Sequence, residues 1–330
     1  MPRSVDCSAS LIGLSASLLL LLAACGSSGT LVGSPGEAEI NLDAQATGFY
    51  ADPNSTPATW VKSHPNDSRT PTIKSKISSQ ASGRWFGGWS GDITPAVRGF
   101  ATAAANAGKI PILVAYNIPG RDCGQYSAGG AASDAAYKTW ISNFAKAIGS
   151  RAAVVVLEPD ALSQLKDCLS GTQQTARLNL IRYAVDQFAN NAKNTKLYLD
   201  AGHNNWVAPA EMASRLKSAN IARARGFALN TSNFGTTANN TSYGNNIVKA
   251  LGSAKRFVID TSRNGNGWNG QWCNPGGRKL GSVSKVVAGN SGLEMLLRVK
   301  TPGESDGNCG VGSGSKAGDF LPQAAYAMAK

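Results

Sequence analysis

Histidine is scarce in this sequence of 330 residues, where only His64 and His203 occur. A three-histidine zinc site is therefore impossible, and a Ser-His-Asp triad would have to use one of these two residues. The sequence also contains no G-x-S-x-G motif, no P-loop and no cysteines at metal-binding spacing. Acid–base catalysis by carboxylates is the enzyme chemistry that these absences leave.

Long apolar runs are also scarce, and the one of note lies at residues 8–24. It has the length of a signal-peptide core and is short for a membrane span. The following LAAC, residues 22–25, resembles a bacterial lipobox, in which Cys25 becomes the lipidated N-terminus. We expect residues 1–24 to be a signal peptide of the lipoprotein type, with ordinary secretion as the alternative. The mature protein is then exported, either to the outer face of the cell membrane or into the medium.

The cysteine count agrees with lipidation. Loss of Cys7 with the signal and use of Cys25 for lipid leave an even set, which suits an oxidising compartment. Residues 25–46 are rich in Gly, Ser, Ala and acidic residues without periodicity, which predicts a flexible tether. Because no internal repeat or second linker follows, we expect one folded domain over residues 47–330.

The formal charge of +12 is spread along the chain. Lysine and arginine form no basic run, and an exported protein seldom meets nucleic acid, so we expect no nucleic-acid partner. Attraction to anionic envelope polymers is an alternative, and solubility is the explanation we prefer.

Short apolar runs alternate with helical patterns through the folded part. Expected strands lie at residues 48–52, 83–87, 110–116, 153–159, 195–200, 225–230, 255–260 and 293–300. Expected helices lie at residues 94–108 and at about 132–148, 173–192, 209–218 and 242–252. Strict alternation of strand and helix predicts an α/β fold with a parallel sheet, and the strand number is near that of a closed barrel.

Aspartates stand at or just after the C-terminal ends of several expected strands. They are Asp122, Asp160, Asp200, Asp260 and Asp306. In a parallel barrel these ends form one rim, which carries the active site. A single aspartate there is usually a helix cap or a solvated charge, but a cluster of like charges is unfavourable unless it is used. The cluster therefore favours hydrolysis by paired carboxylates, whose best-known use is glycoside cleavage.

Tryptophans support a sugar-binding cleft. An indole beside Gly and Asn in a loop can stack on a pyranose ring. Those in expected loops are Trp85, Trp89, Trp206, Trp268 and Trp272, whereas Trp60 and Trp140 lie in helical sequence and are expected in the core.

The segments VAYNIPGRDCGQYSAGG (114–130) and VVVLEPDAL (154–162) resemble the two signature motifs of glycoside hydrolase family 6, the inverting cellulases. The resemblance extends over the chain after the tether, through FYADPNS (49–55), LDAGHNNW (199–206), DTSRNGNG (260–267), QWCNP (271–275) and VKTPGESDG (299–307). It implies a distorted TIM-like parallel β/α barrel with about seven barrel strands, and neither a cofactor nor a metal.

The resemblance also implies roles. Asp160 matches the general acid, and Asp122 matches a second carboxylate that raises the acid's pKa and steers the water. Asp306 matches the base, acting directly or through a water chain to Asp122. Asp200 matches a supporting carboxylate, and Tyr116 the tyrosine that favours a distorted sugar ring. Sugar-contacting positions are matched by Trp89, His203, Trp206, Trp272, Lys300 and Glu304.

Further pairings follow from the same resemblance. It implies disulfides that join Cys123 to Cys168 and Cys273 to Cys309. We expect Asp260 and Arg263 to form a structural ion pair. Glu158, which precedes Pro159 and Asp160, is expected to orient its neighbours.

The loops after Asp122 and Asp306 are short, and this compactness resembles the family's endoglucanases. We therefore predict an open groove and internal cleavage of β-1,4-glucan by a monomer. Cellobiohydrolase-type exo action and a non-catalytic carbohydrate-binding lipoprotein are the alternatives.

Overall fold

The computed structural model describes residues 48–289 and 292–330. The expected signal peptide, the expected lipidation site at Cys25 and the expected tether lie outside the described residues. No helix in the described part is long and apolar enough to cross a membrane.

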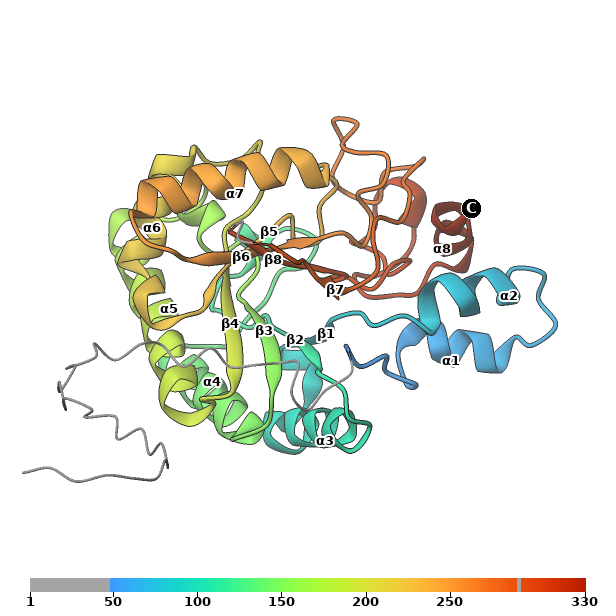
Figure 1. The fold of residues 1–330 in the computed structure, drawn as a ribbon, viewed down its shortest axis with the longest axis horizontal. Coiled ribbons are helices and arrows are strands. Elements are labelled where there is room, and N and C mark those ends of the chain that lie inside the picture. The colour runs from blue at the N-terminus through green and yellow to red at the C-terminus, as the bar shows by residue number, and fades with distance from the viewer. Residues whose placement is uncertain (1–47, 290–291) are drawn as a thin grey trace, which may run out of the picture. The chain divides into compact units, whose positions relative to one another are not determined.

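Eight strands form one sheet in the order β1-β2-β3-β4-β5-β6-β8-β7 (Figure 1). Their bounds are β1 Arg84–Phe86, β2 Ile112–Ala115, β3 Ala153–Leu157, β4 Thr195–Asp200, β5 Gly226–Leu229, β6 Arg256–Asp260, β7 Lys285–Val286 and β8 Leu293–Leu297. Every neighbouring pair is parallel except β7 with β8, which is antiparallel. Seven parallel strands confirm the predicted distorted β/α barrel.

The two ends of the parallel sheet approach each other. Gly83 N–H, next to β1, donates to the Arg298 carbonyl after β8 at 2.8 Å. Trp85 Nε1 donates to the Val299 carbonyl at 2.9 Å. A Cβ at Gly83 would lie 2.4 Å from the Val299 oxygen, so this close approach requires glycine.

Most of the helices cover the outside of the sheet, whereas the first two and the last lie together beside it (Figure 1). Their bounds are α1 Thr56–Ser63, α2 Thr70–Ile73, α3 Ile93–Asn106, α4 Asp134–Ile148, α5 Gly171–Asn191, α6 Pro209–Ser218, α7 Thr237–Leu251 and α8 Pro322–Ala329. Local signals explain where they begin. Asp92 caps α3 by accepting the Thr94 N–H, and Ser170 forms a capping box with Gln173 at α5.

The structure differs from the expectations for one strand and for one tryptophan. The strand expected at residues 48–52 is reduced to one parallel bridge between Phe49 and Ile110. Trp85, expected in a loop, lies in β1 and packs against the barrel interior. Trp60 and Trp140 pack against buried clusters, as predicted.

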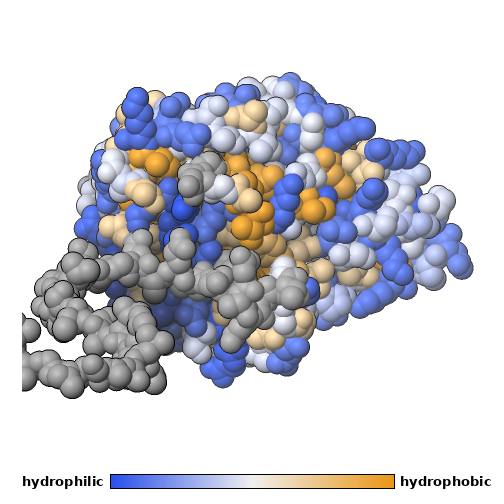
Figure 2. Space-filling view, viewed as in Figure 1, coloured by the Kyte–Doolittle hydropathy of each residue, from blue (hydrophilic) through white to orange (hydrophobic). Residues whose placement is uncertain are grey.

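Alternation along each strand divides the core into two layers. Val154 and Val156 belong to the cluster that fills the barrel, while Val155 and Leu157 belong to the cluster between sheet and helices. Both sets are buried, which is why β3 reads as a continuous apolar run. Each such side chain contributes about 1.5–3 kcal/mol on burial. Figure 2 shows hydrophilic side chains around the periphery of one face and apolar ones towards its middle.

Candidate active site

The turn after β3 places Asp160 at the C-terminal end of the barrel. The apolar strand ends at Leu157, and the residues on both sides of Pro159 have positive φ, +47° at Glu158 and +67° at Asp160. Such backbone is uncommon outside glycine and clusters at functional sites. The Asp160 N–H donates to Oδ1 of Asp200 at 3.0 Å, so the turn is tied to the end of β4.

The Asp160 carboxyl is surrounded by other carboxylates. Burial raises its pKa well above the ordinary value, and the charges of Asp200, Asp122 and Asp306 raise it further, in that order. Carboxylates at or after the ends of three other strands therefore converge on this group, as the strand-end pattern predicts. The raised pKa favours the protonated form of Asp160.

Asp122 lies in the loop after β2 and is also buried. Its Oδ2 accepts the Ser127 N–H at 2.6 Å, and its Oδ1 accepts from Gln164 Nε2 at 3.4 Å. Burial raises its pKa, while these hydrogen bonds and the Arg121 charge act in the opposite direction. The carboxyl is thus fixed within the loop by neutral donors.

Asp306 has the opposite electrostatic environment. Its Oδ2 accepts from Arg263 Nη1 at 2.9 Å and from the Asn274 N–H at 3.0 Å, and Lys300 Nζ lies 3.7 Å from Oδ1. Burial alone would raise its pKa, but the Arg263 and Lys300 charges, together with the hydrogen bonds from Arg263 and Asn274, outweigh burial and hold the pKa below its usual value. Asp306 is therefore ionised at neutral pH and can accept a proton.

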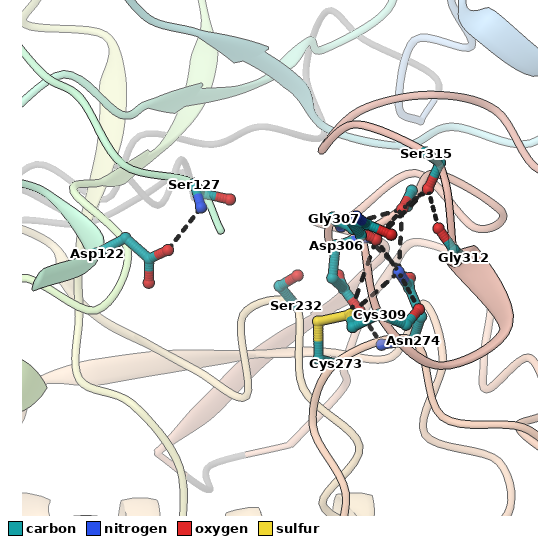
Figure 3. The surroundings of a disulfide bond; sticks show 12 residues. Asp122, Ser127, Ser232, Cys273, Asn274, Asp306, Gly307, Cys309, Gly312 and Ser315 are labelled. Atoms are coloured by element: carbon teal, nitrogen blue, oxygen red, sulfur yellow. Dashed lines mark hydrogen bonds between the residues drawn. A yellow bond between two sulfur atoms is a disulfide. The ribbon is translucent and has the colours of Figure 1, made fainter. Parts of the chain in front are cut away.

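Both expected disulfides are present. Cys123 is joined to Cys168 and Cys273 to Cys309, with Cα atoms 5.8 Å and 5.9 Å apart. Figure 3 shows Asp306 packed against Asn274 and the Cys273–Cys309 bridge, with Asp122 on a separate loop. Each bridge closes a loop of a size for which about 3–4 kcal/mol of stabilisation is typical.

The expected ion pair between Asp260 and Arg263 is wrong. Asp260 is fully buried at the end of β6, and its oxygens accept backbone N–H groups from Ser232, Ser262, Val299 and Lys300. Because these donors occupy the Asp260 oxygens, the Arg263 guanidinium binds the loop after β8 instead. There it pairs with Asp306, a partner that sequence proximity could not suggest.

Asp200 at the end of β4 is almost fully buried. Its Oδ1 accepts the Asp160 and Gly202 N–H groups at 3.0 and 3.1 Å. Burial raises the pKa of Asp200 to about 6, against these hydrogen bonds, which lower it. This carboxyl consequently titrates near pH 6, next to the backbone of Asp160.

The raised pKa of Asp200 gives a stability prediction. The folded protein binds this proton more tightly than the unfolded chain, so the stabilisation is complete below pH 3.8 and is lost as pH rises through 6. Asp200→Asn removes this dependence. We expect the unfolding free energy of the wild type, relative to the variant, to fall by about 2 kcal/mol between pH 4 and pH 7. Urea denaturation at several pH values measures it, and a pH-independent difference would contradict the assignment.

Tyr116, just after β2, has its ring edge-on to Trp85 at a centroid distance of 5.3 Å. Burial raises its pKa well above 10, and the Asp160 and Asp122 charges raise it further. The hydroxyl therefore stays neutral next to the two carboxyls. It can donate or accept a hydrogen bond without adding charge to the site.

Three of the tryptophans expected in loops remain exposed. Trp89, Trp268 and Trp272 keep about half of their surface in solvent, at 56%, 49% and 46%. Trp206 donates from Nε1 to Asp167 at 3.2 Å, and the His203 ring lies 5.4 Å from it. Exposed indoles on loops suit stacking on sugar rings.

Polar groups at the expected sugar contacts are held by neighbours. Burial lowers the pKa of His203 to about 4, so its ring is neutral. Glu304 Oε1 accepts from the Thr56 hydroxyl at 2.8 Å. Lys300 Nζ donates to the Ser305 carbonyl at 3.3 Å and lies 5.6 Å from the Trp85 ring centre. In the described part of the chain, no three His, Cys, Asp or Glu side chains are grouped to share a metal ion.

Sequence reasoning missed Tyr126, on the loop that carries Asp122. Its ring lies 5.6 Å from that of Trp272, and a Cβ at Gly307 would come within 2.8 Å of its Cβ. Tyr126 thus joins the Asp122 loop to the loop next to Asp306. Its place in a glycine-rich stretch, QYSAGG, was the available signal.

Comparisons with known proteins agree on one family. The family model described as glycosyl hydrolases family 6 matches residues 44–329. Endoglucanase 1 of Streptomyces halstedii is 48% identical over 94% of this chain and 97% of its own length. Endoglucanase A of Thermobispora bispora is 42% identical over 96% of this chain and 68% of its own length.

A solved structure matches the whole barrel. The endoglucanase Cel6 of Mycobacterium tuberculosis, in complex with a methyl-cellobiosyl-4-deoxy-4-thio-β-D-cellobioside, has a TM-score of 0.81 and 36% identity, covering 87% of this chain and 97% of that chain. The Humicola insolens endoglucanase CEL6B has a TM-score of 0.71 at 24% identity and supports the fold alone.

Proposed function

The chain belongs to glycoside hydrolase family 6 and is an endo-β-1,4-glucanase, and we propose that it cleaves β-1,4-glucosidic bonds with inversion, using Asp160 as acid and Asp306 as base. One observation carries the proposal: the environment raises the pKa of Asp160 and lowers that of Asp306. Two carboxyl groups whose pKa values are pushed apart can act as acid and base at one pH.

The proposed reaction is a single displacement. Asp160 transfers its proton to the glycosidic oxygen as the bond from that oxygen to the anomeric carbon breaks. A water attacks the anomeric carbon from the opposite face, and its proton passes to Asp306, directly or through a water chain that includes Asp122. Proton exchange with solvent then restores protonated Asp160 and ionised Asp306.

The neighbouring groups prepare this step. The negative charges of Asp200 and Asp122 favour the protonated form of Asp160. Tyr116 offers a neutral hydroxyl where the cleaved sugar would bind, and it would favour a distorted ring. Trp89, Trp206 and Trp272 would stack on sugars on either side of the cleaved bond. His203, Lys300 and Glu304 would supply polar contacts.

Internal cleavage is supported by the comparisons and by the short loops. The relatives at 42–48% identity are named endoglucanases, whereas relatives named cellobiohydrolases are 32% identical or less. Cellulose or a related soluble or amorphous β-1,4-glucan is the proposed substrate.

Viscosity and reducing-end measurements on carboxymethylcellulose distinguish internal cleavage from exo action and from binding without cleavage. We expect its viscosity to fall early, while few reducing ends have formed, and Asp160→Ala to abolish both signals. Release of reducing ends without an early viscosity loss would indicate exo action. Equal weak signals from wild type and variant would indicate a carbohydrate-binding protein.

We also propose export and lipid attachment at Cys25. The two disulfides support an oxidising, extracellular location, and LAAC at residues 22–25 supports the anchor. Detergent partitioning of the processed protein tests the anchor, and a soluble mature protein that lacks Cys25 would exclude it.

A further inference from the structure

Two buried side chains outside the proposed acid–base set hold the backbone that leads to Asp122. Glu158, 1% exposed, follows β3, and Arg177, 4% exposed, lies within α5. Glu158 Oε2 accepts the N–H groups of Asn117 and Ile118, both at 3.0 Å, and Oε1 lies 3.1 Å from the Asn117 nitrogen.

Arg177 holds the next two residues of this segment through their backbone carbonyl groups. Its Nη2 donates to the carbonyls of Pro119 and Gly120, both at 2.9 Å. Pro119 has no N–H to satisfy, and the Asn117 carbonyl accepts the Ala131 N–H at 2.8 Å. This irregular segment thus satisfies its buried polar groups largely through one carboxyl and one guanidinium.

We propose that Glu158 and Arg177 are positioning residues that set the place of Asp122 in the site. The inference rests on the proposed function. Asp122 follows the held segment by two residues and has a φ of +56°, so its direction depends on where residues 117–120 lie. Catalytic groups lose about 100-fold in rate for a misplacement near 1 Å.

The charge state of Glu158 decides which substitution is informative. Burial raises its pKa to about 7, while the Ile118 and Asn117 N–H groups, Tyr137 of α4 and the Arg121 charge lower it. Arg177 also faces it across the segment. A neutral amide with one acceptor oxygen can replace such a carboxyl, because Oε2 already accepts both N–H groups. Methionine has a similar length and no such acceptor.

Glu158→Met and Glu158→Gln form a matched pair. We expect Glu158→Met to lower kcat on carboxymethylcellulose by about 10–100-fold, and Glu158→Gln to stay within about threefold of wild type. The alkaline limb of the kcat profile, which reports loss of the Asp160 proton, should move to lower pH in Glu158→Met, and we expect the same shift in Asp122→Asn because the Asp122 charge is removed. Arg177→Met should reproduce this behaviour, although Arg177 lies in α5 and Glu158 follows β3.

A double-mutant cycle separates positioning from general destabilisation. If Glu158 acts through Asp122, Glu158→Met should cost nothing further in an Asp122→Asn background. Glu294→Met is the matched control, since Glu294 is a largely buried carboxylate, 11% exposed, that pairs with Lys196 and Arg225 at the start of β8. It should lower the melting temperature and leave kcat and the alkaline limb unchanged.

The outcomes are distinguishable from failure of the proposed function. An inactive wild type, or an active Asp160→Ala, would refute the glucanase mechanism itself. With those two controls behaving as proposed, wild-type kcat in both Glu158→Met and Arg177→Met would overturn the positioning role. So would losses that multiply with Asp122→Asn, or an unshifted alkaline limb. If Glu158→Met does not fold, Arg177→Met and Arg177→Lys carry the same test.

Discussion

Asp160→Asn is expected to lower kcat on carboxymethylcellulose by about 10²–10⁴-fold, the usual contribution of a positioned general acid. The loss should be much smaller on an aryl cellooligosaccharide with an activated leaving group, because that group departs with little protonation. The alkaline limb of the remaining activity should disappear, since the titrating proton donor is gone. Initial rates on the two substrates across pH 5–9 measure all three effects.

The fold should tolerate this change. The environment of Asp160 disfavours its ionised form, through burial and through the charges of Asp200, Asp122 and Asp306. Asparagine is neutral and of the same shape, so the melting temperature should be unchanged or higher. Asp134→Asn, an exposed position in the first turn of α4, is the control and should keep wild-type kcat. Equal losses on both substrates would show that Asp160 is not the acid.

Asp306→Asn is expected to damage both activity and stability. Loss of the base should lower kcat by at least about 100-fold, and by similar factors for good and poor leaving groups, because the acid remains. The substitution also leaves the buried Arg263 without its carboxylate. Removing one partner of a buried ion pair typically costs about 3–5 kcal/mol. Urea denaturation and initial rates measure the two effects separately.

The double variant Asp306→Asn/Arg263→Met separates catalysis from ion pairing. It removes both charges of the pair, so most of the lost stability should return while kcat stays low. A single variant that is destabilised but fully active would show that Asp306 serves only as the partner of Arg263. Recovery of kcat in the double variant would lead to the same conclusion.

The positions of the carboxyl groups could be predicted from the sequence because the C-terminal ends of parallel strands lie on the same side of a barrel. Asp160 and Asp200 stand where β3 and β4 end, and alternation of strand and helix places those ends on one rim. The side-chain partners could not be predicted in this way. Arg263 is close to Asp260 in sequence, yet it turns towards Asp306, because backbone donors already fill the Asp260 oxygens.

Other features lacked any readable signal. Arg177 occupies the middle of α5, where an arginine looks like an ordinary surface residue, and its burial follows from how the helix packs on the Asp122 loop. The strand predicted at residues 83–87 is present as β1, but the glycines beside Trp85 also suggest a loop, and nothing in the sequence indicates that this indole helps to bring the ends of the sheet together. Sequence patterns report periodicity and breaks, whereas these placements depend on tertiary contacts.

Proton NMR of the first products from a β-1,4-linked glucan tests the central claim most directly. If Asp160 protonates the leaving oxygen while the base activates a water on the opposite face, the displacement is single and no glycosyl-enzyme forms. The new reducing end should then appear as the α-anomer, before mutarotation produces the β-anomer. An initial β-anomer would mean retention and a covalent intermediate, and would contradict the assignment of Asp160 and Asp306 as an inverting acid–base pair.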